Sequence, residues 1–117
     1  MSVSVQDLLM LKARKYSTTS DSEAFMEDFR YALIRVQADM ARRSSVDFDV
    51  PETLEGTIDV DDGHFGTISD GVDYYLHQSP QWAREDKNEV AMTYIQSLRS
   101  SHGLATESVT AVRVGAS

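Results

Sequence analysis

Residues 20–45 read SDSEAFMEDFRYALIRVQADMARRSS and carry the clearest structural signal in the chain. Apolar side chains recur there at steps of four, three, one, three and four residues, which place them on one helix face. They are Phe25, Phe29, Ala32, Leu33, Val36 and Met40. Ser20 with Glu23 fits a capping box at the start, and Ser44-Ser45 end the pattern. The stretch therefore predicts an amphipathic helix of about 23 residues, or roughly 34 Å.

Shorter helical patterns lie on both sides of this stretch. Ser4 is predicted to cap a first helix that begins at Val5. A third helix is predicted from Phe65 to His77, where Gly66 and Gly71 each cost about 1 kcal/mol relative to Ala. These glycines weaken the helix, but they would also permit close packing against a neighbouring helix.

A fourth helix is predicted to begin at Ser79-Pro80, because Ser is a common N-cap and Pro is favoured in the first turn. Gly103 fits the glycine that often follows a helix end. The predicted buried stripe of this helix consists of Ala83, Val90, Ala91, Tyr94, Ile95 and Leu98.

The segment 46–64 follows a different pattern. Apolar residues alternate with aspartates over residues 46–50, and β-forming residues at 57–60 lie between turn signals. This predicts a short strand, a β-hairpin, or an extended arm with isolated apolar anchors. The whole sequence thus predicts a mainly α protein, a small four-helix bundle over residues 1–103 with an extended loop or hairpin at 46–64. Residues 104–117 are predicted to form an extended C-terminal arm, which either frays or adds to another chain's sheet.

The charge is concentrated in the middle of the chain. The 117 residues carry a formal net charge of −8, and no Lys or Arg occurs between Arg43 and Arg84, where nine carboxylates lie. This distribution argues against a nucleic-acid binder that neutralises phosphates. It indicates either a solvated acidic loop region or a surface that repels or steers a partner.

The sequence contains no recognisable catalytic or metal-binding motif. Cysteine is absent, which excludes disulfides and thiolate ligands. His64 is predicted to be a surface residue in an acidic turn, and an EF-hand register that starts at Asp59 places glycine and histidine at positions five and six. We therefore expect no enzyme, no catalytic residue, no cofactor and no metal. We also expect no signal peptide or membrane span, because the longest apolar run covers only residues 8–11.

Several stretches in order resemble the head-to-tail adaptor (connector, or head-completion) proteins of tailed bacteriophages. They are EDFRYAL at 27–33, ADM at 38–40, IDVD at 58–61, GVDYYL at 71–76 and YIQSL at 94–98. The resemblance covers about residues 20–100. It implies a homo-oligomeric ring, commonly of twelve subunits, that docks to a portal protein and connects it to a tail or nozzle protein. The implied location is the virion neck, after assembly in the host cytoplasm.

The resemblance also implies roles for particular residues. The portal-binding arm would use Leu104, Val109, Val112, Arg113 and Val114. The carboxylates that face the ring lumen, so that DNA passes without specific binding, would be Asp47, Asp49, Asp59, Asp61 and Asp62. Candidate anchors of the subunit interface are Phe48, Ile58, Tyr74 and Trp82. For Tyr74 and Trp82 the alternative is partial burial at the corner of the third and fourth helices.

A second hypothesis belongs to a different functional class. The acidic residues between 47 and 73 could form an interaction module, or a mimic of DNA, that binds a basic partner. Steep salt dependence of partner binding would favour this hypothesis, whereas salt-insensitive docking through the C-terminal arm would favour the adaptor.

Overall fold

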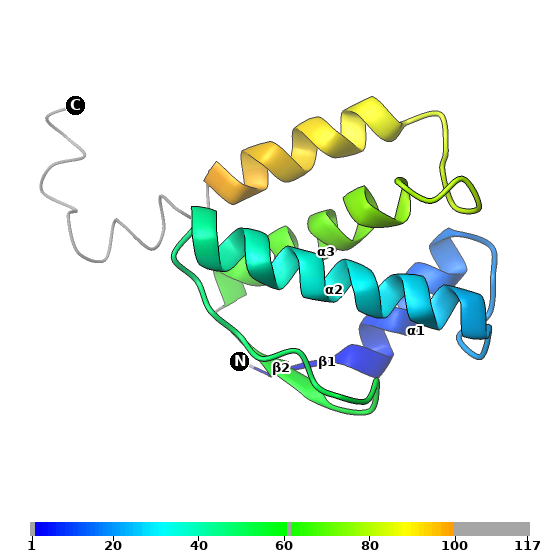
Figure 1. The fold of residues 1–117 in the computed structure, drawn as a ribbon, viewed down its shortest axis with the longest axis horizontal. Coiled ribbons are helices and arrows are strands. Elements are labelled where there is room, and N and C mark those ends of the chain that lie inside the picture. Colours follow the sequence, from blue (N-terminus) through cyan, green and yellow to red (C-terminus); the bar gives the residue numbers. More distant parts are fainter. Residues whose placement is uncertain (1, 61, 100–117) are drawn as a thin grey trace, which may run out of the picture.

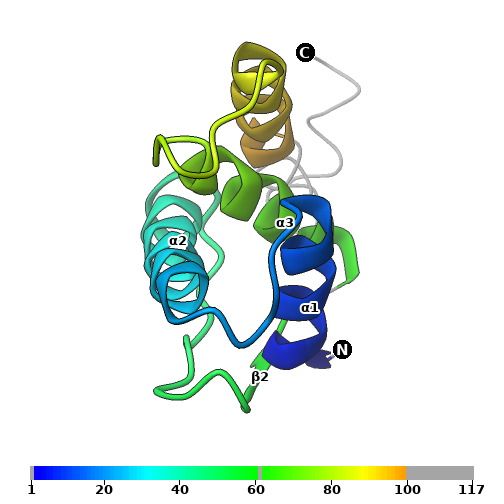
Figure 2. The ribbon, with the colours of Figure 1, turned by 90° about the vertical axis from the view of Figure 1, so that its right-hand side faces the viewer.

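The computed structural model describes residues 2–60 and 62–99, and it is mainly helical with a small two-stranded sheet (Figure 1). The elements in chain order are β1 (Ser2–Ser4), α1 (Val5–Lys15), α2 (Glu23–Arg43), β2 (Thr57–Asp59), α3 (Asp62–Leu76) and a further helix over residues 87–99. Seen end-on, α3 lies between α1 and α2, and the helix 87–99 lies above them (Figure 2). Within the described ranges, no helix is long and apolar enough to cross a membrane.

The predicted amphipathic helix is α2, and all six of its predicted apolar residues are buried. The predicted start is wrong by two residues. Ser22 is the N-cap, and its side chain accepts a hydrogen bond from the backbone N–H of Phe25 at 3.4 Å. Ser20 lies in the preceding turn, so Ser20 and Glu23 do not form a capping box.

The predicted first helix is confirmed as α1. The Ser4 side chain accepts a hydrogen bond from the backbone N–H of Asp7 at 3.2 Å, as expected of an N-cap. The buried stripe of α1 continues from Leu8 to Lys12, whereas the neighbouring Leu11 is exposed. A charged residue thus occupies a core position, and it requires a partner there.

Of the alternatives predicted for residues 46–64, the short strand is found at residues 57–59 and the hairpin is not. β2 pairs antiparallel with β1 at the other end of the chain, with Val3 opposite Ile58. Residues 46–50 form neither a helix nor a strand. Their alternating pattern specifies an apolar and a polar side, and it carries no information on which distant segment supplies the paired strand.

The predicted third helix is confirmed as α3, which starts three residues earlier than predicted. A Cβ atom added to Gly71 would lie 2.5 Å from Val36 Cγ2 and 2.6 Å from Tyr94 Cε1. Gly71 therefore brings α3 close to both α2 and the helix 87–99. Among the described residues, apart from its chain neighbours and the backbone of its own helix, no atom lies within 4 Å of a Cβ added at Gly66, so packing does not require a glycine there.

The predicted start of the fourth helix is wrong, because residues 79–86 form turns and the helix begins at 87. The backbone N–H groups of Trp82 and Ala83 both donate to Ser79 O, at 3.1 and 3.0 Å. These turns bury Trp82, whose ring packs edge-on against Phe25 with centroids 5.0 Å apart. Burial of the indole therefore competes successfully with the Ser-Pro helix start.

The predicted stripe of this last helix is partly correct. Tyr94 and Leu98 are buried and Val90 and Ala91 are half-buried, whereas Ala83 and Ile95 are exposed. The predicted end at Gly103 lies outside the described residues.

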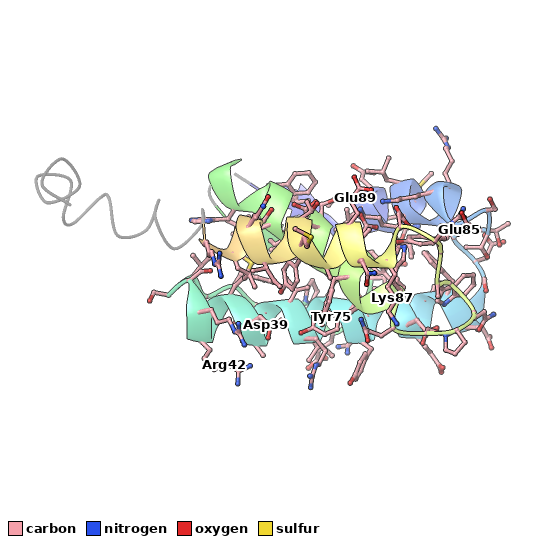
Figure 3. The ribbon with its side chains drawn as sticks, turned by 90° about the horizontal axis from the view of Figure 1, so that it is seen from above. Asp39, Arg42, Tyr75, Glu85, Lys87 and Glu89 are labelled. Carbon is pink, nitrogen blue, oxygen red and sulfur yellow. The ribbon has the colours of Figure 1, made fainter. Side chains whose placement is uncertain are left out.

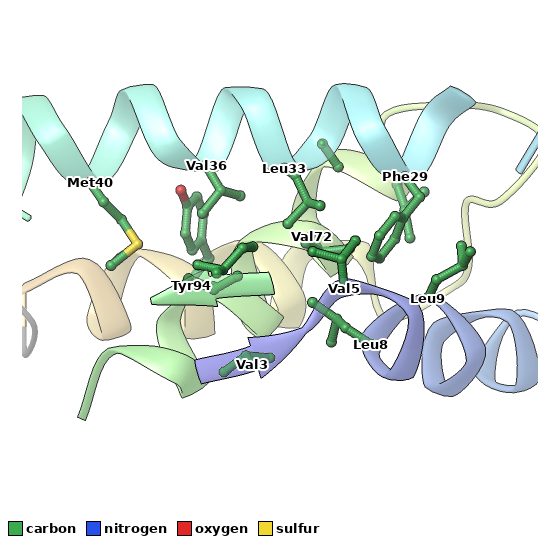
Figure 4. Packing of buried hydrophobic residues seen from close by; sticks show 14 of the residues in the cluster. Val3, Val5, Leu8, Leu9, Phe29, Leu33, Val36, Met40, Val72 and Tyr94 are labelled. Carbon is green, nitrogen blue, oxygen red and sulfur yellow. The ribbon is translucent and has the colours of Figure 1, made fainter. Parts of the chain in front are cut away.

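The hydrophobic core joins the N-terminal segment, α2, α3 and the last helix. Figure 4 shows Val5 and Leu8 at the start of α1 facing Phe29 and Leu33 of α2 across the core, with Val72 of α3 between them. The aromatic residues that close one end of the core are Tyr16, Phe25 and Trp82. Helical periodicity therefore places the apolar stripes correctly, and side chains from both chain halves fill the interior.

Candidate functional site

The acidic segment, which we define as residues 46–59, is the first candidate for a functional surface. Its apolar side chains point inward, with Phe48 and Ile58 buried. Its exposed carboxylates are Asp47, Asp49, Glu52, Glu55 and Asp59. The alternation of apolar and acidic residues therefore produces one buried side and one negatively charged side.

Hydrogen bonds fasten the acidic segment to α1 and α2. The Arg30 guanidinium donates to the carbonyl oxygens of Pro51 and Glu52, both at 3.3 Å. Gln37 Nε2 donates to Asp47 Oδ1 at 2.9 Å, and the backbone N–H of Val5 donates to Gly56 O at 3.1 Å. The carboxylates are thus presented from a backbone that is held at several points.

Not all acidic residues of the middle third belong to this surface. Asp73 is buried in an ionic cluster, and Asp70 is half-buried and accepts a hydrogen bond from Ser97 Oγ at 2.5 Å. Asp61 and the side chain of Asp62 lie outside the described residues. The expectation of one continuous acidic face over residues 47–73 is therefore wrong for Asp73, whose charge is neutralised internally.

The buried ionic cluster consists of Lys12, Lys15, Tyr16 and Asp73 and fastens α1 to α3. Lys12 Nζ lies 3.0 Å and Lys15 Nζ 2.8 Å from Asp73 Oδ2. The hydroxyl of Tyr16 donates to Asp73 Oδ1 at 2.9 Å, and Lys12 also donates to Ser69 Oγ at 2.8 Å. Each polar group thus has a partner, as burial of charge requires.

Burial and charge act in opposite directions within this cluster. Burial alone would raise the pKa of Asp73, but the ammonium groups of Lys12 and Lys15 outweigh it and hold that pKa below its usual value. Burial lowers the pKa of Lys12, and the attraction of Asp73 offsets only part of the effect. For Tyr16, burial and then the Asp73 carboxylate raise the pKa of the phenol. The cluster therefore holds a carboxylate anion and a neutral phenol.

His77 extends the cluster to the turns after α3. Its Nδ1 lies 2.7 Å from the backbone oxygen of Asp73, and its Nε2 lies 3.1 Å from Asp86 Oδ1. The ring also packs edge-on against Tyr16, with centroids 5.4 Å apart. The imidazole is buried, so these contacts join α1, α3 and the 79–86 turns from inside.

A second polar group surrounds Asp39 where α2, α3 and the last helix meet (Figure 3). Asp39 Oδ2 accepts hydrogen bonds from the hydroxyls of Tyr75 and Tyr94, the latter at 2.9 Å. Burial and then Asp39 raise the pKa of Tyr75 to about 12. The Arg35 guanidinium lies 5.6 Å from the Tyr75 ring centroid and 5.9 Å from that of Tyr31, so two aromatic rings orient it.

An open depression of about 210 Å³ adjoins the ionic cluster and is lined by Lys15, Asp70, Asp73, Asp86, Glu89, Val90 and Thr93. Across residues 2–60 and 62–99, no three His, Asp or Glu side chains could together hold a metal ion.

The prediction that His64 lies on the surface is wrong, because this side chain is buried and its Nδ1 has no hydrogen-bond partner among the described residues.

Three helices carry large apolar side chains on their outer faces. These side chains are Met10 and Leu11 on α1, Tyr31 and Ile34 on α2, and Met92 and Ile95 on the last helix. Aromatic residues and Met are enriched at the centres of protein interfaces. The outer helix faces are therefore candidates for subunit contacts.

The predicted interface anchors occupy different positions. Phe48, Ile58 and Trp82 are buried in the core of their own chain, where their apolar surface has no area left for a partner. The Trp82 indole N–H also donates to Asp28 Oδ2 at 2.6 Å. Tyr74 is half-buried beside Tyr94, with ring centroids 5.4 Å apart.

The proposed arm lies outside the described part of the chain. Its predicted portal-binding residues are Leu104, Val109, Val112, Arg113 and Val114. Their role as a portal-binding arm therefore remains a prediction.

The ionic cluster was not predicted, although the sequence carries a signal for it. Lys12 continues the helical spacing of Val5, Leu8 and Leu9, which places a charge on the core side of α1. A charged residue on a buried stripe needs a partner of opposite charge, and Asp73 lies on the stripe of α3 beside Val72. The sequence could have indicated both residues, but not that they pair with each other.

Comparisons of this chain with protein-family models, with curated proteins and with solved structures found no match.

Proposed function

We propose that this chain is a structural virion subunit, a head-to-tail adaptor that forms a ring between a portal protein and the tail. The observation that carries the proposal is the acidic segment, which presents five exposed carboxylates from a fastened backbone. The sequence resemblance to adaptors of tailed bacteriophages supports the same function. In this proposal the helices form a four-helix bundle, and residues 104–117 form the arm that docks to the portal.

The acidic segment would act on DNA by repulsion. A ring of copies would repeat its carboxylates around a lumen, and DNA carries one negative charge per about 1.7 Å of its axis. Like charges at this density oppose adhesion of the phosphates to the wall. Asp47, Asp49, Glu52, Glu55 and Asp59 are the described carboxylates that would line the passage.

Binding to purified portal rings tests the proposal. The full chain should co-sediment with portal rings, and this binding should persist at high salt because the arm's anchors are apolar. Val112→Asp with Val114→Asp should abolish co-sedimentation, whereas Thr110→Asp, a matched change between the anchors, should reduce it less. Failure of the full chain to bind portal rings would contradict the adaptor function.

The exposed carboxylates also favour a second candidate, an acidic module that binds a basic protein. Such binding would depend on Asp47, Asp49 and Glu52, and it would weaken steeply as salt increases. The combined substitution of these three residues by their amides distinguishes the two functions. It should eliminate binding to a basic partner but leave portal docking through the arm unchanged.

A further inference from the structure

Two exposed helix faces lie on opposite sides of the molecule. We call them the α1 face, made of Asp7, Met10, Leu11 and Arg14, and the α2 face, made of Glu27, Tyr31, Ile34 and Arg35. Figure 2 shows α1 and α2 on opposite sides of the central α3. Within residues 2–60 and 62–99, both faces remain uncovered, and the four residues of the α1 face line a shallow depression of about 220 Å³.

The centres of both faces are apolar. Met10 and Leu11 are 51% and 55% exposed, and Tyr31 and Ile34 are 59% and 41% exposed. Large side chains with this exposure supply the apolar area that a subunit contact buries. A Tyr ring contributes a large and rigid contact surface at low cost in conformational entropy.

The charged residues at the ends of the two faces are complementary in only one orientation. Asp7 lies about 10.5 Å before Arg14 along α1, and Glu27 lies about 12 Å before Arg35 along α2, at a rise of 1.5 Å per residue. In an antiparallel arrangement Asp7 meets Arg35 while Arg14 meets Glu27. In a parallel arrangement, like charges would meet at both ends.

The local structure supports this use of Arg35. The rings of Tyr31 and Tyr75 hold its guanidinium in place, at 5.9 and 5.6 Å from their centroids. Asp39 and Asp73, by contrast, are already engaged within the chain. No salt bridge within the described residues engages the side chains of Asp7, Arg14 or Glu27, so these charges are available to a neighbour.

We propose that the α1 face of one copy binds the α2 face of a second copy, with the two helices antiparallel and Tyr31 seated in the α1 depression. Each copy then uses two different surfaces, so the contact is head-to-tail. Repetition of such a contact forms a closed ring when the rotation between successive copies adds up to a full turn. The inference rests on the proposed function in that it names the contact that builds the ring. The contact can be tested without a portal protein.

Engineered cysteines test the orientation, because the natural chain contains none. Copies with Arg14→Cys are mixed at high concentration with copies that carry Glu27→Cys, and the mixture is oxidised. The proposal predicts mixed disulfide dimers, at a yield about tenfold above the control pair of Asp7→Cys and Glu27→Cys, since disulfides need Cα atoms within about 7 Å. A higher yield in the control pair would indicate parallel helices and would overturn the proposal.

A second pair of variants tests whether the contact is head-to-tail. The substitutions Leu11→Glu and Ile34→Glu replace exposed side chains, so both variants should fold and keep the circular dichroism spectrum of the wild type. Each variant alone should fail to self-associate in sedimentation experiments. An equimolar mixture should form dimers and nothing larger, because only the intact α2 face of the Leu11→Glu variant and the intact α1 face of the Ile34→Glu variant can bind each other. Self-association of Leu11→Glu alone, as in a symmetric α2–α2 dimer, would overturn the proposal.

These results separate the two claims. If the wild-type chain binds portal rings but the 14–27 disulfide does not form, the contact is wrong and the adaptor function stands. If the disulfide forms but portal rings are not bound, the contact stands and the adaptor function is wrong.

Discussion

Substitution of Asp73 by Asn should destabilise the fold more than any change at the acidic surface. The carboxylate accepts hydrogen bonds from Lys12, Lys15 and Tyr16 at 3.0, 2.8 and 2.9 Å. The Lys15 side chain is 42% exposed, so water can replace its partner, and its share of the loss is about 0–1 kcal/mol. The Lys12 side chain is only 5% exposed and would keep Ser69 Oγ as its remaining partner.

The loss is therefore dominated by the buried Lys12 charge. Removal of one partner from a buried ion pair costs about 3–5 kcal/mol, and the Asn oxygen can still accept one hydrogen bond, so we expect about 3 kcal/mol. For a chain of 117 residues, that loss lowers the melting temperature by roughly 12 °C. The fluorescence of Trp82, the one tryptophan in the sequence, should report unfolding in urea because its indole is buried against Phe25.

Controls separate the ion pair from a general effect of the substitution. Asp47→Asn, at an exposed position, should change the free energy of unfolding by less than about 0.5 kcal/mol. The double variant Lys12→Met with Asp73→Asn should recover at least half of the loss, since it leaves no buried unpaired ammonium. A loss below about 1 kcal/mol for Asp73→Asn would refute the assignment of the cluster as a principal fastening between α1 and α3.

The same cluster predicts acid sensitivity. The pKa of Asp73 is lower in the folded than in the unfolded chain, so its contribution is present above the usual Asp pKa and is lost as pH falls through the folded value. Urea titrations of the wild type should therefore show a decline below about pH 4 that is smaller in Asp73→Asn. Equal declines in both proteins would contradict a lower pKa of Asp73 in the folded chain.

The remaining predictions concern a phenol, a glycine and two helix ends. Because the pKa of Tyr75 is raised to about 12, its stabilising contribution should be lost between about pH 10 and 12, and Tyr75→Phe should reduce that loss in alkaline urea titrations. Gly71→Ala should lower stability by about 1–2 kcal/mol through its collision with Val36, whereas the matched Gly66→Ala should raise it by up to about 1 kcal/mol; equal effects would contradict the packing argument. Ser17 and Ser45 follow α1 and α2 with φ of 58° and 56°, so glycine at either position should stabilise by about 0.5–1 kcal/mol in thermal melts, and a loss there would be inconsistent with relieved strain.

The sequence predicted the features that depend on local periodicity. The six buried residues of α2 follow from a repeat of three and four, and the Ser4 cap follows from one side chain and one backbone N–H three residues away. These features depend on neighbours in the chain.

Features that depend on distant partners were not predictable. The strand at residues 57–59 pairs with residues 2–4, and no local pattern distinguishes this partner from residues 46–50. The Ser79-Pro80 pair is a valid helix start in isolation, but burial of Trp82 against Phe25 and its bond to Asp28 favour turns instead. No local pattern distinguishes Asp73 from the surface carboxylates, because its partner Lys12 lies 61 residues away.

Electron cryomicroscopy of portal rings mixed with the full chain tests the central claim most directly. The account predicts a closed ring of copies on the portal, with the acidic segment at residues 46–59 lining the lumen and α1 of each copy against α2 of its neighbour. Portal rings that carry no added density, or an added ring whose acidic segment faces away from the lumen, would contradict it.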